Sequence, residues 1–147
     1  MNVSPVQYKQ QERSNNELSD HKFIEQFESL TLDKQFFDHI GHMRLTWLYL
    51  NQYDLEKSIL LVNKNIKAYA ESLGAKDKFH FTITTALVRI IDKRLILSQS
   101  FSWNKFLTNN YDLVDDAISV LLQYYTSELL FSDAARASFI EPDVKSI

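Results

Sequence analysis

The scarcity of glycine and proline is the strongest constraint on the fold of this chain. Its 147 residues include only 2 Gly and 2 Pro. A β-sandwich or a β-barrel needs many tight turns, and these two residue types supply much of the backbone geometry of such turns. The sequence therefore predicts an all-α fold, and we expect a single domain built as an irregular bundle of five or six helices.

The composition fits one folded domain and excludes some classes of partner. The chain is 45% hydrophobic and 24% charged, which is ordinary for a soluble domain. A net charge of −3 gives no basic surface for nucleic acid. The absence of cysteine excludes disulfides and thiolate metal sites and fits a cytoplasmic location. The apolar runs are too short to span a membrane.

The N-terminal segment differs from the rest of the chain. Residues 1–18 are mostly polar and lack the apolar run of a signal peptide. Such a segment buries too little apolar surface to offset the entropy lost on ordering. We expect a flexible tail over residues 1–18 and one helical domain over residues 19–147.

Hydrophobic spacing and capping residues locate the helices. Apolar residues recur at three- and four-residue steps between Asp54, which can cap a helix, and Gly74, which can end one. Helical spacing also predicts helices over 20–30, 39–52 after Asp38, 78–98 after Asp77, 102–106, 112–125 and 132–139. The helix over 78–98 is apolar around most of its circumference, which predicts a central position. The β-branched residues 82–85 also fit a short strand, although no partner strand is evident.

Three of the four histidines lie near the starts of two of these helices. His39 and His42 open the helix over 39–52, where a step of 100° per residue gives them one face together with Thr46 and Tyr49. His80 shares a face of the helix over 78–98 with three further residues, Thr84, Leu87 and Ile91. If the two faces meet, three imidazoles surround one interior site, as in metal centres that keep an open position for substrate.

A carboxylate would complete such a metal site. Glu128 is the leading candidate because hydrophobic residues surround it, and Asp38 and Asp116 are weaker ones. Two histidines and one carboxylate suit non-haem iron or manganese, and a set of histidines also suits zinc. The sequence thus predicts a bound divalent metal ion. Its ligands would be the imidazoles of His39, His42 and His80 and the carboxylate of Glu128. Thr46 and Tyr49 would orient the substrate or a metal-bound water.

Two arginines are expected to form ion pairs away from this site. Arg44 lies on the helix face opposite the histidines, where we expect a surface ion pair. Arg136 is expected to pair with Glu141 or Asp143 and so to fix the C-terminal segment.

Three blocks of sequence carry a resemblance to a known family. They are Phe37-x-His39-x-x-His42-x-Arg44-Leu45-x-Trp47, then Lys78-Phe79-His80-x-Thr82, then a C-terminal block that includes Ser127, Glu128, Leu129, Leu130, Ser132, Ala135 and Arg136. Over residues 36–143 the chain resembles a family of small uncharacterised bacterial helical proteins. The resemblance implies that the three histidine positions and the C-terminal block belong to one pattern, and it attaches no activity to them.

Two functions from different classes fit these observations. The first is a small metal-binding helical protein, or a metal-dependent enzyme, that acts on a small molecule at a histidine-lined interior site. The second is a non-catalytic helical binding or adaptor module in which the histidines only fix the packing of helices. In the first case the partner is a small-molecule substrate, with no nucleic acid and no membrane. The sequence leaves open whether the chain forms a homo-oligomer.

Overall fold

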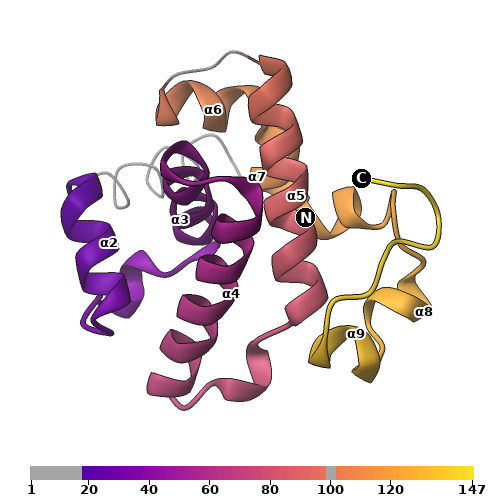
Figure 1. The fold of residues 1–147 in the computed structure, drawn as a ribbon, viewed down its shortest axis with the longest axis horizontal. Coiled ribbons are helices and arrows are strands. Elements are labelled where there is room, and N and C mark those ends of the chain that lie inside the picture. The colour runs from indigo at the N-terminus through magenta and orange to yellow at the C-terminus, as the bar shows by residue number, and fades with distance from the viewer. Residues whose placement is uncertain (1–17, 99–101) are drawn as a thin grey trace.

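The computed structural model describes residues 18–98 and 102–147, and these residues form helices and no strand (Figure 1). This confirms the all-α prediction. Five helices of nine residues or more are joined by short ones. In chain order the elements are α2 (Asp20–Glu28), η1 (Lys34–Phe36), α3 (His39–Gln52), α4 (Leu55–Ser72), η2 (Lys76–Lys78), α5 (Phe81–Ser98), α6 (Trp103–Asn109), α7 (Tyr111–Leu121), α8 (Ser127–Leu130) and α9 (Asp133–Ala137).

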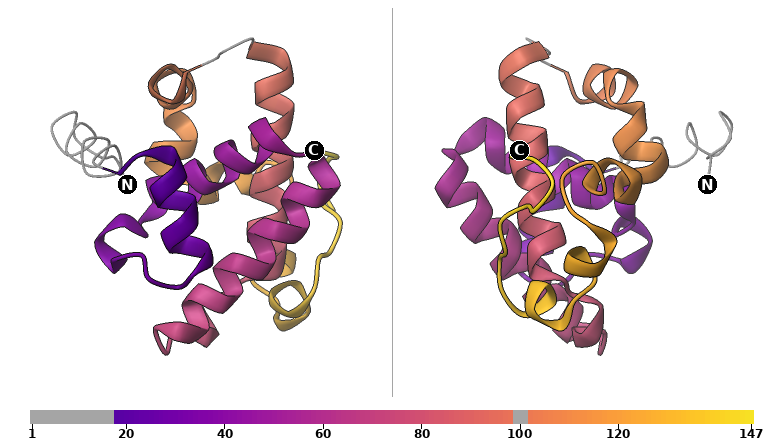
Figure 2. Two further views of the ribbon diagram at one scale, coloured as in Figure 1. Left: turned by 60° about the vertical axis from the view of Figure 1, so that its left-hand side comes forward. Right: turned by 90° about the vertical axis from the view of Figure 1, so that its right-hand side faces the viewer.

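The helix α5 lies at the centre of the arrangement. It packs along α4 and also contacts α3, α7 and α9, and Figures 1 and 2 show α2 and α3 on one side of it and α8 and α9 on the other. Its all-round apolar sequence agrees with this position, because a helix with neighbours on several sides has few positions left for polar residues. Residues 82–85 belong to this helix, so the alternative of a short strand is wrong.

The helix α3 lies between two hydrophobic clusters. Its residues Ile40, Met43 and Trp47 join a cluster with α5, α6 and α7. Its residues Leu45 and Tyr49 join a second cluster with α2 and α4. Since α3 is covered on two sides, most of its 14 residues are buried, and its polar residues must find partners inside the protein.

Two of the predicted helices differ clearly from the observed ones. Asp77 lies inside the turn η2 and does not cap α5, which begins at Phe81. The helix predicted over 112–125 is shorter and is kinked at Asp116, where φ is −154° and ψ is 80°. The Asp116 carboxylate accepts hydrogen bonds from the amide and the hydroxyl of Ser119, at 3.1 and 2.6 Å, and so caps the second half of α7.

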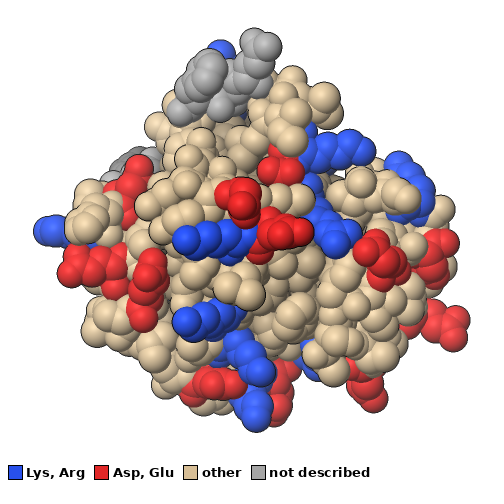
Figure 3. Space-filling view, in the orientation of Figure 1, with Lys and Arg blue, Asp and Glu red and all other residues tan. Residues whose placement is uncertain are grey.

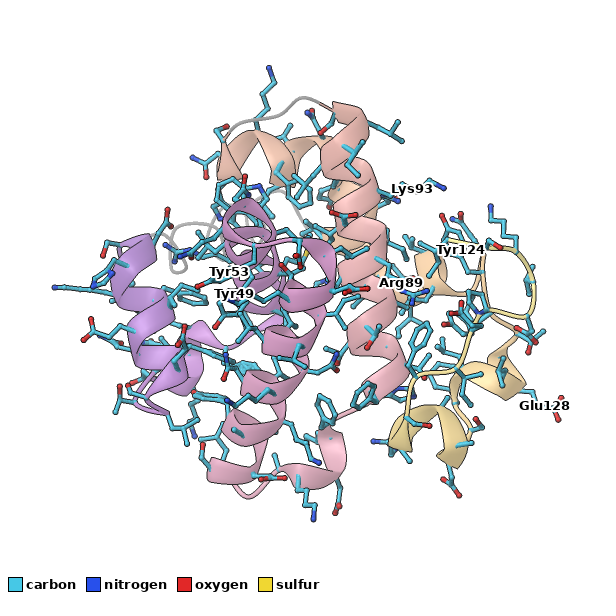
Figure 4. All side chains as sticks on the ribbon, in the orientation of Figure 1. Tyr49, Tyr53, Arg89, Lys93, Tyr124 and Glu128 are labelled. Atoms are coloured by element: carbon cyan, nitrogen blue, oxygen red, sulfur yellow. The ribbon has the colours of Figure 1, made fainter. Side chains whose placement is uncertain are left out.

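The C-terminal segment is fixed by contacts other than those expected. Arg136 donates to the carbonyls of Asp77 and Phe79, at 2.5 and 3.4 Å. Glu141 instead pairs with Arg89, the α5 residue labelled in Figure 4. Asp143 accepts hydrogen bonds from the amide and hydroxyl of the α8 cap, Thr126. The prediction for Arg136 is therefore wrong, because the loop before α5 offers it carbonyl oxygens.

Arg44 is buried, with only 3% of its side chain exposed, so the expected surface position is wrong. Its Nη2 atom donates to Asp20 Oδ1 at 2.9 Å and to the carbonyl of Leu18 at 2.7 Å. The guanidinium also lies 4.6 Å from the centre of the Phe23 ring. The face opposite the histidines is covered by α2, and Arg44 helps to attach α2 to α3.

The expected flexible tail over 1–18 lies outside the described residues, except for Leu18. This residue is half-buried against the cluster around α2 and α4, and its carbonyl is held by Arg44. The folded body therefore begins at least one residue earlier than predicted. In residues 18–98 and 102–147, none of the helices combines the length and the apolar character that crossing a membrane requires.

Replacing Arg44 by methionine should lower the free energy of unfolding by roughly 1–3 kcal/mol, because a buried carbonyl and a charge-assisted hydrogen bond lose their partner. Urea unfolding followed by circular dichroism measures this loss. The matched control is Arg89→Met, which removes an exposed ion pair and should cost less than about 1 kcal/mol. Equal losses in the two variants would show that Arg44 does not hold α2 in place.

Candidate functional site

A cavity of about 180 Å³ lies where the first turns of α3 and α5 face each other, with α4 behind them. We call it the histidine pocket. Its wall includes three imidazoles, two hydroxyls and one amine, from His39, His42, His80, Thr46, Thr84 and Lys78, and the rest is apolar. The structure thus brings the three predicted histidines and Thr46 to one cavity, and the expected face of α5 meets the expected face of α3.

His80 is buried and uses both of its ring nitrogens. Its Nδ1 atom accepts a hydrogen bond from the Ile83 amide at 3.1 Å, and its Nε2 atom donates to the Leu130 carbonyl at 2.8 Å. An amide can only donate and a carbonyl can only accept, so the ring is neutral with its proton on Nε2. Burial accordingly lowers the pKa of His80. The ring caps α5 and links it to α8, and it has no lone pair left for a metal.

His39 is exposed at the edge of the pocket and joins α3 to α7. Its Nε2 atom lies 2.6 Å from the Leu113 carbonyl and donates to it. In the neutral ring this places the proton on Nε2 and leaves the lone pair on Nδ1. His39 therefore has a packing role and keeps one acceptor atom.

His42 differs from the other two histidines because it lacks a hydrogen-bond partner among the described residues. The ring is half-buried and packs on Phe37, with 4.3 Å between the ring centres. No side chain or backbone group in the described part of the chain bonds to its nitrogens. Burial, and to a lesser degree the neighbouring His39, lowers the pKa of His42 to about 4. The ring is therefore neutral near pH 7 and offers one donor and one acceptor to the cavity.

A second cavity of about 420 Å³ adjoins the first. The two share His39, His42, Ile83 and Leu87, so the imidazole of His42 lies at the boundary between them. The far wall of the second cavity is the kinked part of α7, with Asp115 and Asp116. The wall of the second cavity thus includes carboxylates, whereas the wall of the histidine pocket includes the amine of Lys78.

Of the two residues expected to orient a substrate, Thr46 lines the histidine pocket and Tyr49 does not. Thr46 lines the histidine pocket, but its hydroxyl donates to the His42 carbonyl at 3.0 Å. The Tyr49 hydroxyl donates to Glu28 at 3.0 Å and accepts from Asn65 at 2.8 Å, so it is directed away from the pocket. Burial and the Glu28 carboxylate raise the pKa of Tyr49. The structure gives Tyr49 a role between α2, α3 and α4.

None of the predicted carboxylates joins the three histidines. Glu128 is exposed on α8 and extends away from the body of the protein (Figure 4). Asp38 caps α3 by accepting from the Gly41 amide at 2.7 Å. Asp116 lines the second cavity but caps a half-helix. Within residues 18–98 and 102–147 no group of three or more His, Asp or Glu side chains is arranged to hold a metal ion, and metal binding stays a prediction.

Two side chains of the site are absent from the sequence prediction. Lys78 lines the pocket because the chain around it forms the turn η2, whereas the sequence placed it in a long helix. Phe37 supports the His42 ring from the residues before α3. No family model, curated protein or solved structure matches this chain.

The neutral state of His42 predicts a pH dependence of stability. Its pKa is about 4 in the folded protein, against an ordinary value of 6.5. As the pH falls, the unfolded chain binds the proton first, so stability present above pH 6.5 is lost between pH 6.5 and about 4. The loss is at most about 1.4 kcal/mol per pH unit for one histidine. Urea unfolding at a series of pH values measures it.

The variant His42→Gln should show a smaller loss over the same pH range, and the remaining loss comes from groups such as His80. His21→Gln is the matched control, because the His21 side chain is 89% exposed, and it should follow the wild type. A His42→Gln protein with the pH dependence of the wild type would show that His42 takes up its proton equally well in both states.

Proposed function

We propose that this protein binds a small molecule in the histidine pocket, with His42 as the side chain that hydrogen-bonds to it. The observation that carries the proposal is the state of His42, which is half-buried, neutral near pH 7 and without a hydrogen-bond partner in the described residues. The His42 ring lines the cavity, so its one donor and one acceptor are available to a molecule that enters.

The rest of the pocket supports the same role. Most of its wall is apolar, with a few polar groups that converge on it, which is the usual composition of a small-molecule site. Thr84 adds a hydroxyl that forms no hydrogen bond within the described residues. The histidines around it are held by the backbone of α7 and α8, so the pocket is formed before a ligand enters.

The outer surface offers less for a partner to recognise on the face that Figure 3 shows. Lysine, arginine, aspartate and glutamate side chains alternate there and build no large region of a single sign. Charge on this face suits solubility more than the capture of a charged macromolecule. This favours the cavity over that face as the functional feature.

The metal-dependent function is the second candidate, and the pair His39 and His42 is the observation that favours it. The two lie three residues apart on α3, and each has a ring nitrogen that the described residues do not occupy. His80 cannot join them without giving up the cap of α5. A metal here would therefore need ligands beyond those that the sequence predicts.

The proposal predicts that small fragments bind at the histidine pocket. We would label the methyl groups of the protein and titrate it with fragments that fit a cavity of about 180 Å³. Signals of Met43, Ile83 and Leu87 should shift, and that of Leu107, which lines neither cavity, should not. His42→Gln should weaken the binding about tenfold, which corresponds to about 1.4 kcal/mol for one hydrogen bond.

His21→Gln is again the control and should bind as the wild type does. If no fragment shifts the pocket signals, or if His42→Gln binds equally well, the proposal is wrong. A parallel titration of untagged protein with zinc tests the second candidate. Stoichiometric binding that is lost in both His39→Gln and His42→Gln would favour a metal site instead.

A further inference from the structure

The charge around the histidine pocket points to the chemical class of its ligand, and this inference rests on the proposed function. Lys78 is the one lysine in the lining of the pocket, and no arginine, aspartate or glutamate lines it. It is exposed, it lies on η2 at the solvent edge of the cavity, and it forms no ion pair within the described residues. A charged ligand would therefore meet a positive charge.

The first turn of α5 adds to this positive potential. A helix carries a partial positive charge at its N-terminus, and α5 is 18 residues long. Most helix caps in this protein are hydroxyls or carboxylates, and Asp38 places a negative charge at the start of α3. The cap of α5 is the neutral imidazole of His80. No carboxylate in its cap offsets the positive end of α5, and Thr84 in its first turn adds a hydroxyl donor.

The second cavity has the opposite character. Asp115 and Asp116 form part of its far wall, and carboxylates there repel an anion. The shared residues Ile83 and Leu87 between the two cavities are apolar. An anionic ligand would thus turn its charged end toward Lys78 and lay its apolar part over Ile83 and Leu87.

We infer that the ligand is a small monocarboxylic acid with an apolar chain, whose carboxylate lies between Lys78 and the first turn of α5. The volume of the pocket, about 180 Å³, limits the ligand to a short chain. The apolar wall contributed by Met43, Val62 and Ile66 excludes a second charged group. The imidazole of His42 donates its N–H to the acid.

The experiment compares three molecules of equal length: hexanoate, hexanamide and hexylamine. They are titrated into the full-length protein at pH 7.5, and the methyl shifts of Met43, Ile83 and Leu87 report binding in the pocket. Hexanoate should bind roughly fivefold more tightly than hexanamide, from the combined effect of Lys78 and the α5 dipole. Hexylamine, which is cationic, should bind more weakly than either.

Lys78→Gln should reduce the affinity for hexanoate by about threefold and leave that for hexanamide unchanged. Lys76→Gln is the matched control, since Lys76 lies on the same turn but does not line the pocket. Equal binding of acid and amide, or a preference for the acid that is undiminished in Lys78→Gln, overturns the inference. If none of the three binds while other fragments shift the pocket signals, the inference is overturned and the proposed function stands. If no fragment shifts them, both are overturned.

Discussion

The imidazole of His80 holds together the part of the structure on which the pocket depends. The central helix α5 begins one residue after it, and the backbone amide of Ile83 would lack its capping partner without the Nδ1 atom. The other nitrogen binds the Leu130 carbonyl and so fixes α8 against α5. Because the bond from the Ile83 amide needs an unprotonated Nδ1 atom, the position of α5 depends on a side chain that titrates near neutral pH when it is exposed.

The position of α3 follows from the same packing. This helix lies between two clusters, and several of its polar side chains find partners on different sides. Arg44 reaches Asp20 and the Leu18 carbonyl on the α2 side. Tyr49 reaches Glu28 and Asn65. Thr46 bonds back to the His42 carbonyl within the helix. His42 is left to face the cavity, where it lies among the other polar side chains of the pocket.

Sequence patterns were sufficient for the fold class and for which residues share each of two helix faces. Hydrophobic periodicity and the lack of glycine and proline specify helices, and a step of 100° per residue puts His42 and Thr46 on one side of α3. The same step puts His80 and Thr84 on the facing side of α5. These are properties of a single helix, so they can be derived from local sequence.

The chemical roles of the residues could not be derived in this way. Arg44 looked like a surface residue because helical geometry does not show that α2 covers that face. Glu128 looked like a ligand because apolar residues flank it, yet on α8 those residues turn inward and leave the carboxylate outside. His80 looked like a ligand because the sequence does not show that Ile83 and Leu130 occupy its two nitrogens. Each of these facts depends on contacts between segments far apart in the chain.

His80 and His42 differ in how the protein uses their ring nitrogens. Both rings are neutral in the folded protein, and both have a lowered pKa because burial disfavours the imidazolium ion. For His80 the cost of burial is offset by two hydrogen bonds. For His42 the described residues provide only the Phe37 ring. Two hydrogen bonds within the protein account for the imidazole at position 80. The His42 ring instead keeps its donor and its acceptor for the cavity, and the proposal of a small-molecule site rests on this difference.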